Sequence, residues 1–152
     1  MVERNKVSLS DHTRSLIDDA RYLFEETYQT VGNPKILISV VRDCHSALST
    51  MLLDIMHKKG IALGTVPEYY GPIISNNIAL ENWLKEAVVQ HDIAVGWLNH
   101  YNRREVDFYR NETYYMIADN NNLASINASQ VRLMIDAAMR LYEEWYNLWK
   151  NH

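Results

Sequence analysis

Several features are scarce in this 152-residue sequence, and each scarcity excludes a class of protein. There is one cysteine, Cys44, so no disulfide can form within the chain, and a reducing cytoplasm is the simplest compartment. The longest apolar runs, such as ILI and IAL, are far too short to cross a bilayer. The first residues, MVERNKVSLSDH, lack the apolar stretch of a signal peptide. We therefore expect a cytoplasmic protein that does not associate with membranes.

Net charge is also small. The formal charge is −4, which argues against a non-specific grip on a nucleic-acid backbone, although a local basic site stays open. Hydrophobic residues make up 47% and charged residues 22%, which are ordinary values for a globular protein and do not indicate disorder. The length suits a single domain over residues 1–152, with its core over about residues 10–150.

Proline and glycine number three and five, and they cluster in two places, at residues 32–34 and between Gly60 and Pro72. The segments between these clusters are long enough for uninterrupted helices. The first helix is expected over about residues 10–31, where apolar side chains recur at steps of three and four. The residues of this stripe are Leu16, Ala20, Leu23, Thr27 and Val31, widened by Ile17, Phe24 and Tyr28.

The first joint, GNP, predicts a tight turn between antiparallel helices. Gly32 ends the first helix, Asn33 is placed to cap the next, and Pro34 fits a first helical position, where a missing N–H costs nothing. The second helix is expected over residues 34–59, with Gly60 as its stop. A longer loop then leads to a third helix.

The third helix is expected from about Ser75 to Tyr101. Its apolar stripe includes Trp83, Leu84 and His91, and it contains one glycine, Gly96. Glycine inside a helix either weakens the helix or marks close packing against a neighbour. Both interpretations stay open for Gly96.

The last helix has the clearest start. Asn127 is placed as its cap, Gln130 follows three residues later as in a capping box, and Ile126 and Val131 are placed as a hydrophobic staple. Apart from TYYMIA (113–118), no segment alternates as a strand does. We therefore expect an all-α protein, an up-and-down four-helix bundle.

Charged and aromatic side chains crowd the segment NRREVDFYRNE, residues 102–112, which holds three arginines and three acids. Its plainest interpretation is a solvated helix end, in which Arg103 and Arg104 pair with Asp107 one turn later. The alternative is a polar pocket at a dimer seam. There the arginines would face a phosphate or carboxylate, and Asp107 would orient one guanidinium.

Two segments together resemble HEPN domains, a family of helical bundles associated with nucleotidyltransferases. VVRDCHSALSTMLLDIMHKKG (40–60) is similar to the second helix of that family, which ends in a basic residue and glycine. RREVDFY (103–109), followed by INASQVRLMIDAAMRLYEEWYNL (126–148), resembles the C-terminal half of one HEPN subgroup. In that subgroup an Arg is followed four residues later by an Asp and then an aromatic residue. The matching positions here are Arg103, Asp107 and Phe108.

The resemblance implies a homodimer that acts with a nucleotidyltransferase or in a toxin–antitoxin or other defence system. Many HEPN domains are metal-independent endoribonucleases, in which an Arg stabilises phosphate charge and a His four to six residues later moves protons. No His follows Arg103, Arg104 or Arg110 at that spacing. An Asp in its place repels phosphate and is a poor acid at neutral pH. We therefore expect a degenerate, non-catalytic module associated with RNA or a nucleotide, without a cofactor.

In this hypothesis the phosphate or nucleotide contacts Arg103, Arg104, Asp107 and Arg110. Two other functions stay open. In an active endoribonuclease toxin, the catalytic candidates are Arg103, with His45 or Tyr109 replacing the usual His. In a purely structural interaction module, the aromatic surface around Trp145 and Trp149 holds a partner protein.

Two other reactive side chains are expected to be structural. Cys44 falls on the apolar stripe of the second helix and is expected to be an inert small hydrophobe. His91 falls on the stripe of the third helix and is most simply a hydrogen-bonded core residue. His45 is either a surface residue beside Cys44 or the spatial substitute for the missing catalytic His. No two histidines have the i,i+4 spacing of a helical metal site, so we expect no metal.

Overall fold

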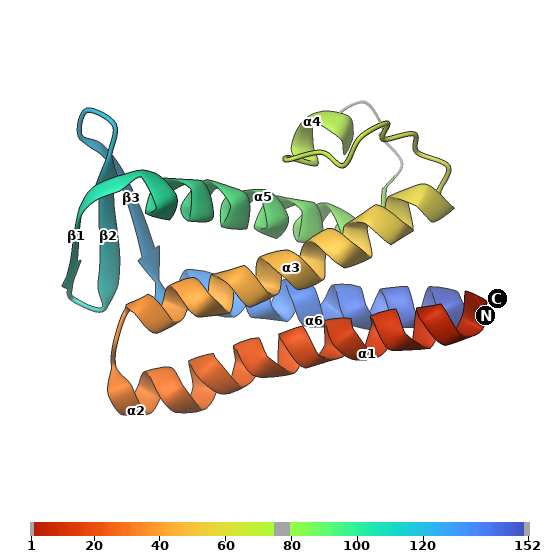
Figure 1. Cartoon of the computed structure of the whole chain (residues 1–152), viewed down its shortest axis with the longest axis horizontal. Helices are drawn as coiled ribbons and strands as arrows, with labels where there is room; N and C mark the ends of the chain where they lie inside the picture. The colour runs from red at the N-terminus through yellow and green to blue at the C-terminus, as the bar shows by residue number, and fades with distance from the viewer. Residues whose placement is uncertain (1, 75–79, 151–152) are drawn as a thin grey trace.

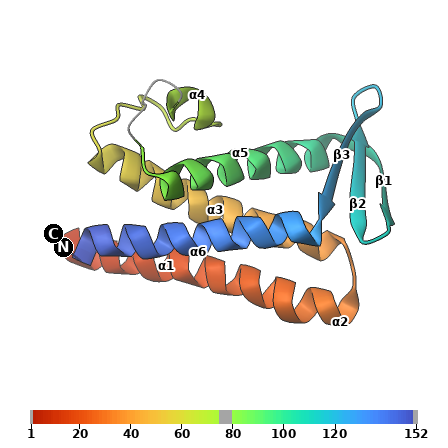
Figure 2. The same cartoon turned by 180° about the vertical axis from the view of Figure 1, so that it is seen from behind.

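Four long helices lie side by side, and a small sheet stands across one end of them (Figure 1). The computed structural model of the protein describes residues 2–74 and 80–150. The first helix begins at the end of the bundle that lies opposite the sheet, and the last helix finishes there too (Figures 1 and 2). The sheet therefore lies far from both ends of the chain.

The elements follow one another with few long connections. Their bounds are α1 Val2–Tyr22, the π-helical turn η1 Leu23–Tyr28, α2 Gln29–Val31, α3 Lys35–Lys58, α4 Gly71–Ile74, α5 Asn82–Arg103, β1 Arg104–Arg110, β2 Thr113–Ala118, β3 Asn122–Asn127 and α6 Ala128–Lys150. The expected start of the third helix at Ser75 lies outside the described residues, but residues 80 and 81 are not helical and α5 begins at Asn82, later than expected.

The prediction of an all-α four-helix bundle is wrong, because residues 104–127 form an antiparallel sheet with the strand order β1-β2-β3. The protein is α+β. The segment 102–112, interpreted as a helix end, is mostly strand and turn, since α5 stops at Arg103 and Arg104 has extended backbone angles. TYYMIA was the one stretch with strand alternation, and it is the central strand β2.

The central strand forms because its side chains alternate between a buried and a half-buried face. On β2, Tyr114, Met116 and Ala118 are buried against the helices, while the side chains between them are half-buried on the other face. The two turns need a backbone with positive φ, and residues 111, 112 and 119–121 supply it, with φ between 43° and 67°. Four of these five are Asn or Asp, which tolerate that conformation better than other non-glycine residues.

The first helix packs with the predicted stripe except at its end: Ala20 is fully buried, and Leu16, Leu23 and Thr27 are half-buried. Ile17, Phe24 and Tyr28 are buried, whereas Val31, the last residue of the expected stripe, is 64% exposed. Apolar residues cover a wide arc of this helix, and only its contacts with α3 and α6 decide which part of the arc becomes core. The π-helical turn ends at Tyr28, whose hydroxyl lies 3.1 Å from the hydroxyl of Tyr109 on β1.

The central helix is α3, which packs against α1, α5 and α6. Its start is as predicted, because Gly32 has a φ of 69° and the Asn33 side chain accepts a hydrogen bond from the Lys35 amide at 2.9 Å. By length and composition alone α3 is apolar enough to cross a membrane, but the core helix of a folded domain passes the same test. Half of its apolar window is buried by the rest of the protein.

The start of α6 is also as predicted. The Asn127 amide donates to Gln130 Oε1, and the Gln130 amide donates to Asn127 Oδ1, each at 3.0 Å. Ile126 and Val131 are both fully buried. The reciprocal bonds of the capping box satisfy two N–H groups that a helix N-terminus otherwise leaves unpaired.

Gly96 weakens α5, since it is exposed and a Cβ added there would meet nothing within 4 Å. We expect Gly96→Ala to raise the free energy of unfolding by about 0.5–1 kcal/mol, because alanine loses less backbone entropy in a helix. Urea denaturation would measure this. Gly71→Ala is the contrasting variant, since its Cβ would lie 2.8 Å from Asp92 Oδ2 and should destabilise the protein. A destabilising Gly96→Ala would contradict the open environment of Gly96.

Candidate functional site

The arginines of the predicted site are separated and mostly paired. Arg104 Nε lies 3.2 Å from Asp107 Oδ2, which confirms one of the two expected ion pairs. Arg103 pairs instead with Asp119, at 3.1 Å and with both side chains more than half exposed. Arg110 is exposed at the far end of β1. The three guanidinium groups therefore do not converge on one point.

A β-bulge explains why Arg104 and Asp107 meet. The register shifts between Arg104 and Val106, so Arg104 lies opposite Ala118 and Asp107 opposite Met116, both on the buried side of β2. Without the extra residue, side chains three positions apart on a strand would point to opposite faces.

Asp107 is held by internal contacts. The Tyr114 hydroxyl donates to Asp107 Oδ2 at 2.5 Å. That hydrogen bond, followed by the contribution of Arg104, lowers the pKa of Asp107 against the opposing effect of burial. The Arg104 guanidinium also donates to the Tyr101 carbonyl at 2.7 Å and lies 3.7 Å from the centre of the Tyr101 ring. Arg104 and Asp107 thus stabilise the junction between α5 and the sheet.

His45 lies in a different part of the molecule. Its ring stacks on that of His91, with 5.1 Å between the ring centres, and its Nε2 is 3.4 Å from Ser49 Oγ. Burial, and then the neighbouring His91, lower the pKa of His45. Among the described residues no contact joins His45 to Arg103, so the structure does not bring together the proposed pair of catalytic side chains.

Buried polar side chains form a hydrogen-bonded chain between α3 and α5. His91 is 1% exposed, and its Nδ1 lies 2.9 Å from Asp92 Oδ1 while its Nε2 lies 3.1 Å from Ser49 Oγ. His91 is therefore a bonded core histidine, as predicted. Cys44 nearby is fully buried, and burial raises the pKa of its thiol to about 12, so it is inert.

The loop after α3 covers these hydrogen-bonded side chains because Asp92 binds the backbone of the loop. Asp92 accepts hydrogen bonds from the backbone amides of Tyr70 at 2.9 Å and Gly71 at 2.8 Å. Tyr70 is buried and packs edge-on against the His91 ring, 5.0 Å between centres. Gly71 is suited to this place, because any Cβ there would collide with the Asp92 carboxylate.

A cavity of about 260 Å³ opens beside these hydrogen-bonded side chains. His45, Ser49 and His91 line it together with apolar and polar side chains of the loop and of α5. Those side chains include Val66, Glu68, Val95, Leu98 and Asn99. Asn99 Nδ2 donates to Glu68 Oε1 at 2.8 Å, so the loop is fastened to α5 on this side too.

Ser49, Asp92 and Asn99 were missed in the sequence. One signal was available, since His45 and Ser49 are four residues apart and share a helix face. The other half of the cluster could not be found in this way. It depends on which face of α5 meets α3 and on where the loop lies, and both are set by long-range packing.

The face of the sheet that points away from the helices is unusually apolar. We call it the outer face; its apolar members are Val106, Phe108, Tyr115, Ile117 and Leu123, and the polar residues on the same side are Arg110, Thr113, Ser125 and Asn127. Val106 and Leu123 are each 55% exposed, and Phe108 is 44% exposed and stacks on Tyr115 with 4.9 Å between ring centres. Antiparallel sheets with one solvated face usually carry polar residues there. The outer face departs from that pattern.

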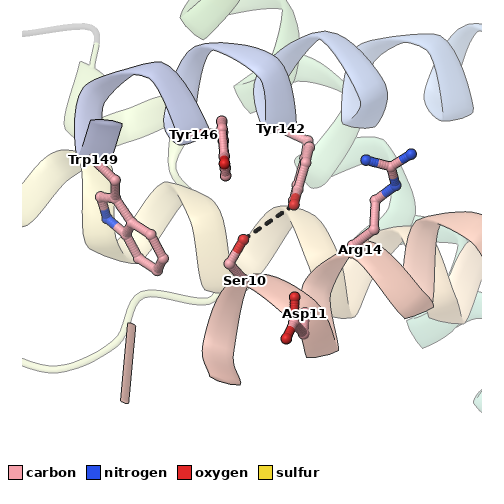
Figure 3. Close-up of a pocket in the computed structure, with 6 residues that line it drawn as sticks. All are labelled: Ser10, Asp11, Arg14, Tyr142, Tyr146 and Trp149. Carbon is pink, nitrogen blue, oxygen red and sulfur yellow. Dashed lines mark hydrogen bonds between the residues drawn. The ribbon is translucent and has the colours of Figure 1, made fainter. Parts of the chain in front are cut away.

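A groove of about 530 Å³ lies between α1 and α6 (Figure 3). Its lining is Ser10, Asp11, Arg14, Tyr142, Tyr146 and Trp149. Several of its polar groups have internal partners: Ser10 Oγ lies 3.0 Å from the Tyr142 hydroxyl, and Arg14 pairs with Asp18 at 3.4 Å. It therefore offers aromatic surface but no set of converging free polar groups.

The prediction that Trp145 and Trp149 form an exposed aromatic surface is wrong for Trp145, which is fully buried. The indole N–H groups of Trp145 and Trp149 donate to Asp54 Oδ2 at 2.7 and 3.1 Å. Burial alone would raise the pKa of Asp54, but these two bonds and the neighbouring Lys58 outweigh it, so the pKa is lowered. Trp145 is core because α6 turns it toward α3.

Within the parts of the chain that the structure describes, no three His, Cys, Asp or Glu side chains form a group that could hold a metal ion. In comparisons with known proteins, the chain matches no protein-family model, no curated protein and no solved structure. These comparisons give the HEPN resemblance no support. The assignment to that family stays a prediction from the sequence.

Proposed function

We propose that the protein is a protein–protein interaction module that self-associates through the outer face of its sheet. The observation that carries this proposal is the row of apolar side chains on a solvated sheet face, with Val106, Phe108 and Leu123 each at least 44% exposed. Fully burying one such side chain is worth about 1.5–3 kcal/mol. Contiguous exposed apolar surface of this kind marks binding sites in monomeric proteins.

A second copy of the chain suits this surface. Among the residues in register on the outward side of the three strands, Arg110 carries a positive charge, and the acidic Glu112 follows it in the β1–β2 turn. Two copies facing each other would therefore supply both an apolar centre and charges of both signs at the rim. Symmetric dimers are also the commonest assembly of soluble proteins.

The size of the outer face predicts a weak dimer. Three strands about 4.8 Å apart, each about 20 Å long, offer roughly 300 Å² per partner. A standard stable interface buries about 800 Å² per partner. We therefore expect association that depends on concentration, with exchange between monomer and dimer.

Sedimentation velocity over a range of about 1–500 μM would test self-association. The wild type should shift from one to two copies of the 17.8-kDa chain as concentration rises. Phe108→Ser should raise the dissociation constant at least about tenfold, or about 1.4 kcal/mol. Tyr22→Ser is the matched control, because Tyr22 is an aromatic residue 65% exposed on α1, and it should leave the dimer unchanged. A wild type that stays monomeric at the highest concentration would refute self-association.

Association with RNA, a nucleotide or a nucleotidyltransferase, and a role in toxin–antitoxin or other defence systems, stay predictions from the HEPN resemblance. The endoribonuclease alternative requires Arg103 beside a proton carrier. Arg103 pairs with Asp119, while Tyr109 meets Tyr28 on the buried side. These contacts favour the interaction module over the ribonuclease.

A further inference from the structure

In the hydrogen bonds that link Ser49, His91 and Asp92, the chemistry of the groups determines which atom donates and which accepts. A carboxylate only accepts hydrogen bonds, so Nδ1 of His91 must carry the proton that faces Asp92. The other ring nitrogen, Nε2, then has a lone pair and accepts from the Ser49 hydroxyl. The order carboxylate, imidazole, hydroxyl is the one that activates a serine nucleophile.

Ser49 differs from three threonines of the helices. Thr13, Thr30 and Thr50 each donate to the carbonyl four residues earlier, at 2.8 to 3.0 Å, which is the ordinary structural use of a helical hydroxyl. Ser49 has no such bond and lies between the two histidines instead. It is half-buried and lines the cavity, so a small molecule can reach its oxygen.

We propose that this cavity is a catalytic site for acyl transfer from a small ester or thioester to water, with Ser49 as nucleophile. Ser49 Oγ bonds to the acyl carbon while its proton passes to Nε2 of His91. His91 then gives that proton to the departing alkoxide or thiolate as its bond to the acyl carbon breaks. Water attacks the acyl-serine in the same way, releasing the carboxylic acid and returning the proton to Ser49.

Other residues around the cavity fit this reaction. Asp92 is a positioning residue, since it touches His91 rather than the substrate and is itself fixed by two backbone amides. Asn99 bonds to Glu68, and this contact fixes the loop that forms one side of the cavity. Val66 and Leu98 supply apolar lining, and a volume of about 260 Å³ limits the acyl group to a small one.

A covalent probe gives the sharpest test. A fluorophosphonate reagent should label the wild-type protein once per chain, and peptide mass spectrometry should place the label on Ser49. Ser49→Ala should lose the label and most of the hydrolysis of p-nitrophenyl acetate, while its circular dichroism shows that it still folds. Ser46→Ala, on the exposed side of the same helix, should keep both activities.

Labelling decides the outcome, because free imidazoles also hydrolyse activated esters slowly. A wild-type protein that takes no label, or a label that persists in Ser49→Ala, would overturn the proposal. The test is independent of self-association, since Phe108→Ser changes the outer face and should leave the labelling of Ser49 intact. Failure of one proposal is thus distinguishable from failure of the other.

Discussion

Trp145→Ala is expected to lower the free energy of unfolding by about 3–5 kcal/mol, the usual effect of removing a large aromatic side chain from a core. Trp145 is fully buried, and its indole N–H donates to Asp54 at 2.7 Å. The substitution would leave a cavity between α3 and α6 and remove one of the hydrogen bonds that hold the Asp54 carboxylate. Urea denaturation followed by circular dichroism would measure the loss.

Tyr146→Ala is the matched control for this prediction. Tyr146 follows Trp145 on α6 but is 48% exposed, so its removal should change stability by no more than about 1 kcal/mol. A Trp145→Ala variant as stable as Tyr146→Ala would mean that Trp145 does not belong to the core.

Asp92→Ala is expected to cost about 2–4 kcal/mol and to release the loop after α3. The carboxylate accepts hydrogen bonds from the amides of Tyr70 and Gly71 and from His91. Its loss leaves three donors without their acceptor, and bonds to a charged group are worth about 1.5–3 kcal/mol each before the loop relaxes into water. Hydrogen exchange of the two amides should accelerate more than exchange in α3.

Asp136→Ala serves as the control for charge removal, because Asp136 is exposed on α6. It should change stability by no more than about 0.5 kcal/mol. If Asp92→Ala left the exchange of the Tyr70 and Gly71 amides unchanged, another contact would have to hold the loop in place. The prediction holds whether or not the cavity is catalytic.

Local signals predicted the helices well. The GNP joint, the stop at Gly60 and the capping box at Asn127 and Gln130 each involve residues within a few positions of one another. Caps and turns of this kind are decided by φ preferences and by short-range hydrogen bonds, which a single sequence displays. These caps and turns could therefore be predicted without knowing which elements pack against them.

The segment 102–112 was misinterpreted for the opposite reason. Its charges at i,i+3 and i,i+4 spacing suit a helix, and the strand it forms depends on pairing with β2, whose other edge is covered by β3. The bulge after Arg104 then reproduces an i,i+3 contact with Asp107 inside a strand. Strand pairing and register are long-range properties, and a charge pattern alone does not distinguish them from a helix end.

The candidate sites divide in the same way. The sequence by itself determined the long helices, their caps and the burial of Cys44 and His91, because these follow from local propensity and apolar periodicity. Only the tertiary structure decided that Ser49, His91 and Asp92 meet beside a cavity. It also decided that the apolar side chains of β1, β2 and β3 gather on one exposed face. Each of these groupings joins residues from elements far apart in the chain, and packing of those elements is what brings their side chains together.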